Sequence, residues 1–170
     1  MSFFLRLVLL LAPFFLGGCL FEKPLTSGPS ESVNSWFLGE WKRTDKTGAT
    51  SRALVTPADN DLYRVQITHS EKGASAEYHF EAWASKVGDS TFLTLRNLRT
   101  TAKVPMGAFV FLQPQMLKQN QIRLRSLHLT APSTATSKEL RAEIRARLKD
   151  GTLYGNEESC DWERTAEVYL

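Results

Sequence analysis

The sequence has few of the residues and none of the motifs that identify most enzymes and metalloproteins. It contains two cysteines and three histidines in 170 residues. No G-x-S-x-G, H-E-x-x-H, P-loop or glycine-rich dinucleotide turn occurs in it. With no motif on which to base a catalytic site, we expect a protein that is not an enzyme and that has no cofactor and no resident metal.

A strong charge of one sign is also missing. The chain carries 21 Lys and Arg against 18 Asp and Glu, a net charge of +3. Nucleic-acid-binding domains usually show a pronounced basic field or a basic face. We therefore expect no nucleic-acid partner.

The chain has one apolar run near its start, and this run is too short to span a bilayer. Residues 7–16 are apolar and follow Arg6, but the run contains Pro13 and ends at Gly17 and Gly18. Spanning a bilayer takes about 20 apolar residues. A positive residue before a short apolar segment is typical of a secretory signal. The sequence predicts a signal peptide over residues 1–18 rather than a permanent transmembrane helix.

One of the two cysteines directly follows this segment, in Leu16-Gly17-Gly18-Cys19. The motif resembles the lipobox of bacterial lipoproteins, in which the cysteine thiol receives diacylglycerol, the signal is cut before it, and the new amine is acylated. The resemblance implies that Cys19 is the lipid attachment site and that the membrane is a partner. Two or three acyl chains anchor a protein stably. The implied location is the periplasm-facing cell envelope, at the outer rather than the inner membrane because Leu20, not aspartate, follows.

The segment after the lipid site differs in composition from the rest. Residues 19–34 are rich in serine, proline, glycine and glutamate, a composition typical of a flexible tether. Residues 35–170 form the expected folded domain. If Cys19 is lipidated, Cys160 is the only remaining thiol, so no intramolecular disulfide can form and the domain depends on its core.

From residue 35 onward, short alternating segments separated by turn residues predict strands. The clearest has Tyr63, Val65 and Ile67 on one face of a strand, with polar residues on the other. The apolar parity changes within 121–129, which predicts a bulge near Arg125 and Ser126. The expected strands are 35–43, 52–56, 62–69, 76–85, 91–96, 108–113, 121–129 and 162–169.

One helix interrupts this pattern. Thr136 and Glu139 form a capping box, and Leu140, Ile144 and Leu148 follow at four-residue spacing. A helix is predicted from Ser137 to Lys149. The expected fold class is all-β, an antiparallel up-and-down barrel of about eight strands with this amphipathic helix before the last strand.

Two positions carry a resemblance to a barrel superfamily. Gly39 and Trp41, in the first expected strand, look like the G-x-W motif of lipocalin-like (calycin) barrels, in which the tryptophan closes the barrel floor and stacks on an arginine from the last strand. The resemblance implies that Arg164 is this arginine. The chain departs from the usual pattern because its helix precedes the final strand and the disulfide is missing. Residues 35–169 also resemble uncharacterised small bacterial lipoproteins.

The interior of an eight-stranded barrel is either filled by side chains or holds one small ligand. Our first hypothesis is a lipid-anchored envelope protein whose lipocalin-like barrel binds a small apolar ligand. The alternative is a filled barrel that presents its surface to an envelope protein and binds no ligand. The possible pocket-lining residues are Tyr63, Tyr78, Phe80, Phe109 and Phe111.

A third hypothesis, a hydrolase or a metal site, depends on Glu77, His79 and Glu81. These residues share one face of an expected strand at two-residue spacing. A metal site needs ligands that converge from several elements, and the same pattern is typical of a solvent-facing strand. The solvent-facing interpretation is favoured.

Overall fold

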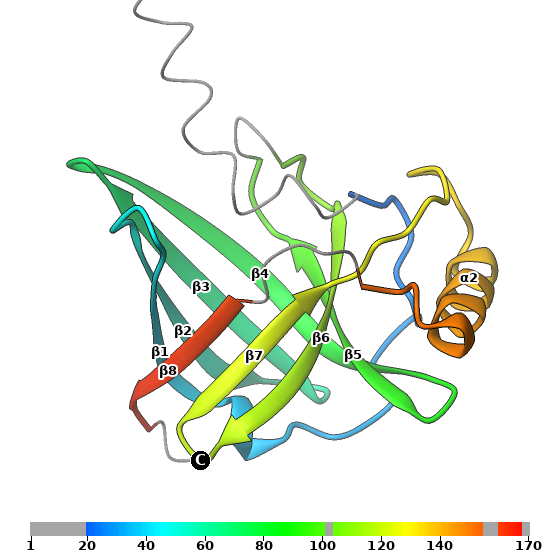
Figure 1. Ribbon diagram of the computed structural model, residues 1–170, viewed down its shortest axis with the longest axis horizontal. Coiled ribbons are helices and arrows are strands. Elements are labelled where there is room, and N and C mark those ends of the chain that lie inside the picture. The colour runs from blue at the N-terminus through cyan, green and yellow to red at the C-terminus, as the bar shows by residue number, and fades with distance from the viewer. Residues whose placement is uncertain (1–19, 101–103, 155–159, 168–170) are drawn as a thin grey trace, which may run out of the picture.

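The computed structural model describes residues 20–100, 104–154 and 160–167, and the expected signal peptide and Cys19 lie outside these residues. Eight antiparallel strands follow one another around a closed barrel, and the first strand pairs with the last (Figure 1). One helix lies between the seventh and eighth strands. The predicted fold class is therefore confirmed.

Most element bounds lie within three residues of those expected from alternation, but the first strand begins four residues later and the sixth strand ends five residues later than expected. Residues 168 and 169 of the last expected strand lie outside the described residues. A short 3-10 helix η2 (Ser35–Phe37) precedes the barrel, and helix α2 (Ser137–Asp150) precedes its last strand. The strands are β1 (Gly39–Thr44), β2 (Thr50–Ala58), β3 (Leu62–Glu71), β4 (Ala74–Val87), β5 (Ser90–Asn97), β6 (Phe109–Lys118), β7 (Gln121–Ser126) and β8 (Cys160–Ala166).

The two ends of the barrel differ. Because neighbouring strands are antiparallel, the β1–β2 and β3–β4 turns lie at the same end, together with the start of β6. We call this the open end. Helix η2 lies at the opposite end, beside the start of β1, and we call that end the closed end.

Two local expectations are corrected. The predicted first strand begins with η2, because the Asn34 side chain accepts a hydrogen bond from the Trp36 N–H (3.0 Å) and starts a helical turn. The bulge expected near Arg125 and Ser126 is absent, since β7 ends at Ser126. The alternation of apolar residues changes there because Leu127 follows the end of β7 and packs in the apolar cluster outside the barrel.

Helix α2 has the predicted capping box. The Thr136 hydroxyl accepts from the Glu139 N–H (3.3 Å), and the Glu139 carboxylate accepts from the Thr136 N–H (2.8 Å). Gly151 ends the helix in the left-handed conformation. The helix lies outside the barrel (Figure 1). Its buried side chains Leu140 and Ile144 belong to the apolar cluster on the outer wall.

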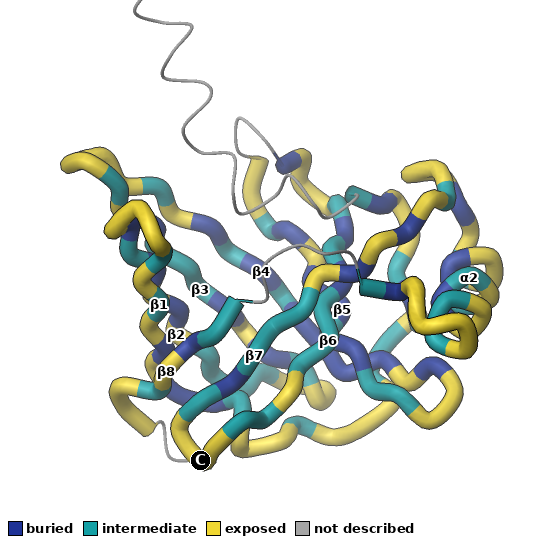
Figure 2. Tube along the Cα trace, in the orientation of Figure 1, coloured by how far each residue is buried: buried dark blue, intermediate teal, exposed yellow. Residues whose placement is uncertain are grey.

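Residues 20–34, which we call the strap, do not form the predicted flexible tether. Phe21 is 2% exposed and Leu25 is 0% exposed. The Phe21 and Phe109 backbones exchange hydrogen bonds of 3.0 and 2.8 Å, and the Ser30 N–H donates to the Ala84 carbonyl (2.8 Å). The strap runs along the outer wall beside α2 (Figures 1 and 2). The tether expectation fails here because two large apolar side chains are buried within a polar segment.

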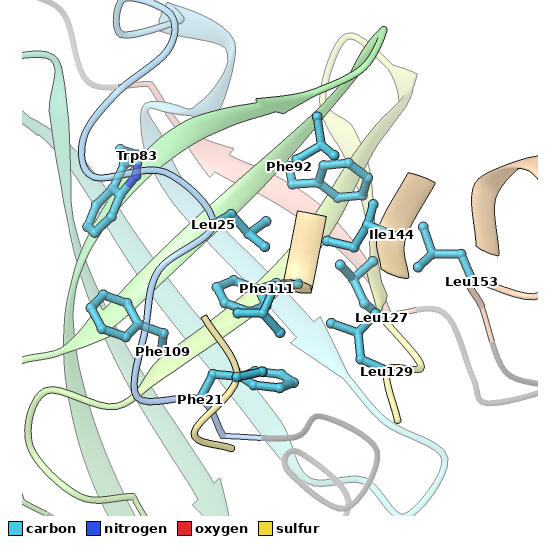
Figure 3. Close-up of a cluster of buried hydrophobic side chains, with 13 residues drawn as sticks. Phe21, Leu25, Trp83, Phe92, Phe109, Phe111, Leu127, Leu129, Ile144 and Leu153 are labelled. Carbon is cyan, nitrogen blue, oxygen red and sulfur yellow. The ribbon is translucent and has the colours of Figure 1, made fainter. Parts of the chain in front are cut away.

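The strap and α2 together cover an apolar cluster on the outer face of the sheet (Figure 3). Phe21 stacks on Phe111 with ring centroids 5.2 Å apart, and Trp83 meets Phe109 edge-on at 6.1 Å. This outer cluster is separate from the barrel interior. Among the described residues, no helix combines the length and the apolar character needed to span a bilayer.

Candidate ligand-binding cavity

The barrel interior contains a cavity of about 130 Å³. Each of the eight strands contributes side chains that point inward from alternate positions. Phe37 of η2 also lines the cavity. Apart from the tyrosine hydroxyls and tryptophan indoles, the polar side chains on the wall are His69 and Ser126. An apolar cavity of about 150 Å³ in a protein core is known to hold benzene. The interior therefore has space for a small apolar molecule.

Aromatic side chains from η2 and β3 close one end of this cavity. Phe37 meets the Tyr63 ring edge-on at 5.8 Å and 83°. The Asn34 N–H donates to the Tyr63 hydroxyl (2.7 Å), and the Trp41 Nε1–H donates to the Phe37 carbonyl (3.0 Å). Burial raises the pKa of Tyr63, so its hydroxyl stays neutral while it accepts this bond. These contacts hold η2 across the closed end of the barrel.

Trp41 and Arg164 form a cation–π pair at the closed end of the barrel. Trp41 and Arg164 are register partners in β1 and β8, and the guanidinium carbon lies 4.9 Å from the ring centroid. Arg164 also donates to the Trp36 carbonyl, so one side chain links η2, β1 and β8. The sequence-based pairing of Trp41 with Arg164 therefore corresponds to a contact in the structure.

Gly39 allows the first and last strands to meet closely. Its φ is +130°, a conformation that side-chain-bearing residues rarely adopt. A Cβ atom at this position would lie 2.4 Å from the backbone oxygen of Ala166 in β8. Glycine is therefore required here for a backbone conformation and for a close approach.

Replacing Arg164 with alanine is expected to lower the free energy of unfolding by about 1–2 kcal/mol, since it removes a shielded cation–π contact and a bond to η2. Urea denaturation checks this. Arg145→Ala, at an exposed position of α2, is the matched control and should change the free energy by less than about 0.5 kcal/mol. Equal midpoints for the two variants would contradict the role of Arg164 in closing the barrel.

The sequence-based set of lining residues divides into two groups. Tyr63, Tyr78 and Phe80 line the cavity. Phe109 and Phe111 do not, and the expectation for them is corrected: they point outward into the cluster under the strap and α2 (Figure 3). Burial raises the pKa of Tyr78, which favours its neutral form within the barrel.

Val110 and Leu112 occupy the positions expected for the two phenylalanines. Every residue from Ala108 to Leu112 is apolar, so alternation does not show which face of the strand points inward. The outward face is apolar because the strap and α2 cover it. No local signal distinguishes the two faces, and only the packing of distant segments decides between them.

Sequence reasoning also missed a buried polar pair at the open end of the barrel. Ser51 and His69 are register partners in β2 and β3, and Ser51 Oγ lies 2.9 Å from His69 Nδ1. Both lie toward the open end. Of the two, His69 lines the cavity, as does exposed Ser126 at the end of β7. The inward parity of His69 with Val65 and Ile67 is the signal that could have identified it.

Glu77, His79 and Glu81 lie on the outer face of β4, away from the cavity. His79 Nε2 is 3.1 Å from Glu77 Oε1, whereas Glu81 forms an ion pair with Arg96 at 2.5 Å. Glu77 and His79 thus contact each other, whereas Glu81 pairs with a residue of the neighbouring strand β5. Across the described part of the chain, no group of three or more His, Cys, Asp and Glu side chains is arranged to hold a metal ion.

Comparisons with models of protein families, with curated proteins and with solved structures found no match to this chain. The class of protein is therefore defined by the fold and the cavity alone. It is a closed, eight-stranded antiparallel barrel with an apolar interior, an architecture that is consistent with a ligand-binding, calycin-like domain.

Proposed function

We propose that this protein is a lipid-anchored protein of the bacterial cell envelope that binds a small apolar ligand inside its barrel. The ligand-binding part depends on one observation, the apolar cavity of about 130 Å³. Protein interiors are normally close-packed. At about 24 cal/mol per Å³, an empty cavity of this size costs about 3 kcal/mol of stability. A binding role accounts for the retention of such a space.

Small side chains on the wall help to create the cavity. Ala53 of β2 and Ala82 of β4 both line it, at positions where a leucine side chain would extend into the space. The neighbouring Leu54 points to the outer face of the barrel and is exposed. A larger side chain at Ala53 or Ala82 would therefore fill the cavity, whereas a substitution at Leu54 would leave it unchanged.

Ala53→Leu is expected to weaken the binding of a small aromatic probe, 4-fluorotoluene, by at least tenfold because the new side chain occupies the probe's space. The ¹⁹F NMR spectrum of the probe, titrated with protein residues 20–170, measures this. This range contains the strap, the helix and all eight strands. Leu54→Ala is the matched control and should leave the affinity unchanged. If wild-type protein leaves the probe spectrum unchanged, the filled-barrel alternative replaces this proposal.

The anchoring part of the proposal depends on the sequence around Cys19, and the strap adds a geometric consequence. Phe21 pairs with Phe109, the first residue of β6, at the open end. Only Leu20 separates Cys19 from this attachment. Acyl chains on Cys19 would hold the open end against the bilayer, because the strap is packed on the barrel. A ligand would then exchange between the cavity and the membrane.

A further inference from the structure

We propose that the outer wall of the barrel binds the phosphate group of a polar phosphomonoester through Lys42 of β1 and Arg52 of β2. This site lies outside the barrel and is independent of the ligand proposed for the interior cavity. Among the described residues, the apolar cluster under the strap and α2 contains no residue of β1 or β2, and both cations are exposed. This part of the wall is therefore open to a ligand.

A hollow of about 540 Å³ lies on the outer side of strands β1 to β3, beside Thr165 of β8. Trp41 and Ala53 form the wall between this hollow and the interior cavity, because both residues border the two spaces. The residues that alternate with inward-facing ones and line the hollow are Glu40, Lys42, Arg52, Leu54, Gln66 and Thr68. All of these except Leu54 are charged or polar. The hollow is therefore suited to a polar ligand.

Lys42, Arg52 and Thr68 form one row across three strands. Lys42 and Arg52 are register partners in β1 and β2, and Arg52 and Thr68 are register partners in β2 and β3. Side chains directly opposite each other on neighbouring antiparallel strands have Cβ atoms about 5 Å apart. An ammonium, a guanidinium and a hydroxyl therefore project from adjacent positions into the same hollow, and all three can donate hydrogen bonds to one anion.

The two cations of this row repel each other. Like charges directly opposite each other destabilise a sheet. Among the residues that the structure describes, neither Lys42 nor Arg52 has an ion pair or a side-chain hydrogen bond that offsets this repulsion. A bound anion would turn the repulsion into two attractions, which gives the pair a physical reason to exist.

The acidic residues around the row do not neutralise it. Glu40 lies two residues before Lys42, and Glu163 is the register partner of Lys42 in β8. Within the described ranges, neither carboxylate comes close enough to Lys42 to form an ion pair. Glu77 of β4 is engaged by His79, whose Nε2 lies 3.1 Å from Glu77 Oε1. The positive charge of the row therefore remains available to a ligand.

The charge of the pair indicates the class of ligand. A phosphomonoester carries about −1.5 to −2 charges at pH 7 and has three acceptor oxygens, whereas a carboxylate carries a single charge. Arginine binds phosphate through two parallel N–H bonds, and lysine adds a compact positive charge. One phosphate group therefore balances both Lys42 and Arg52. The hollow is larger than a phosphate group, so the rest of the ligand lies beside it, next to Glu40 and Gln66.

Glucose 6-phosphate and glucose test this site in an NMR titration of wild-type residues 20–170. We expect the phosphate ester to shift the amide signals of Lys42, Arg52 and Thr68, and glucose at the same concentration to leave them unchanged. Arg52→Gln should lower the affinity for the ester at least tenfold, because it removes one of the two charges that hold the phosphate. Lys42→Gln should have a similar effect and is the second variant of the test.

Arg64→Gln is the matched control. Arg64 is exposed on the outer face of β3, but it does not line the hollow and has no cation opposite it. The substitution removes the same charge from the protein as Arg52→Gln does. It should change the affinity for glucose 6-phosphate less than twofold. Equal losses in Arg52→Gln and Arg64→Gln would show a general effect of charge and refute the site.

Melting temperatures provide a second measurement. Without the ester, Arg52→Gln should raise the melting temperature by about 1–3 °C at low salt, because the repulsion with Lys42 is gone, whereas Arg64→Gln should not raise it. Glucose 6-phosphate should raise the melting temperature of the wild type but not that of Arg52→Gln. If the ester shifts no amide signal of the wild type and leaves its melting temperature unchanged, the proposal is wrong.

Vesicles distinguish the two sources of such a phosphate group, a lipid head group and a soluble ester. Wild-type residues 20–170 are sedimented with phosphatidylcholine vesicles that contain or lack phosphatidic acid. Sedimentation that requires both phosphatidic acid and Arg52 assigns the site to a lipid head group. Binding of glucose 6-phosphate without sedimentation assigns it to a soluble ester. Neither result bears on the interior cavity, which 4-fluorotoluene tests separately.

Discussion

Gly39→Ala is expected to lower the melting temperature by about 6–12 °C, corresponding to a loss of about 3 kcal/mol or more in the free energy of unfolding. Two effects add together. Alanine disfavours the observed φ of +130°, and its Cβ would lie 2.4 Å from the Ala166 carbonyl oxygen. The obstructing atom belongs to the backbone of β8, so the strands that close the barrel must separate.

Gly48→Ala is the matched control for this change. Gly48, in the β1–β2 turn, also has a positive φ of +84°, but a Cβ atom there would meet no atom within 4 Å. Its substitution should therefore cost only the conformational term, about 1 kcal/mol. Thermal melts of both variants, monitored by circular dichroism, distinguish the cost of the positive φ from the cost of the Cβ contact with the Ala166 oxygen. Similar melting temperatures would show that the approach of Gly39 to Ala166 does not limit the closure of the barrel.

Cys19→Ser is expected to abolish membrane attachment in a bacterial host with a lipoprotein pathway. The thiol is the proposed acceptor of diacylglycerol, and a serine hydroxyl is a much poorer nucleophile at neutral pH. Incorporation of labelled palmitate should fall to background. The protein should either remain as an unprocessed precursor or leave the membrane fraction.

Cys160→Ser is the control for the anchor experiment because Cys160 is the other cysteine of the chain. It should keep both labelling and membrane association. Cys160 is the first residue of β8. Its side chain is half-buried and packs against the buried cluster that contains Trp41 and Trp162. Labelled fatty acid on the Cys19→Ser variant would refute the proposed attachment site and the orientation of the barrel that depends on it.

Local patterns were sufficient to predict the architecture. The alternation of Tyr63, Val65 and Ile67 marks a strand with one buried face, and the Thr136–Glu139 capping box marks the start of the helix. Both patterns arise from interactions among near neighbours in the chain, which is why sequence alone reveals them. The pairing of Trp41 with Arg164 came from a resemblance to calycin barrels rather than from such a pattern.

The cavity could be predicted only in part. Tyr63, Tyr78 and Phe80 alternate with polar residues, so their inward direction follows from the sequence. Phe109 and Phe111 alternate with apolar residues, and their direction depends on the strap. Whether the interior is filled depends on the summed volumes of side chains from all eight strands, which no single segment contains.

By itself, the sequence determined the number and order of the strands, the helix before the last of them, and the cysteine chemistry expected at position 19. Only the tertiary structure decided that residues 20–34 pack on the barrel, which strand faces point inward, and that Ser51 meets His69 between β2 and β3. The physical reason is distance along the chain. Periodicity and capping act between close neighbours, whereas Phe21 reaches Phe109 and Gly39 approaches Ala166 only after the barrel has closed.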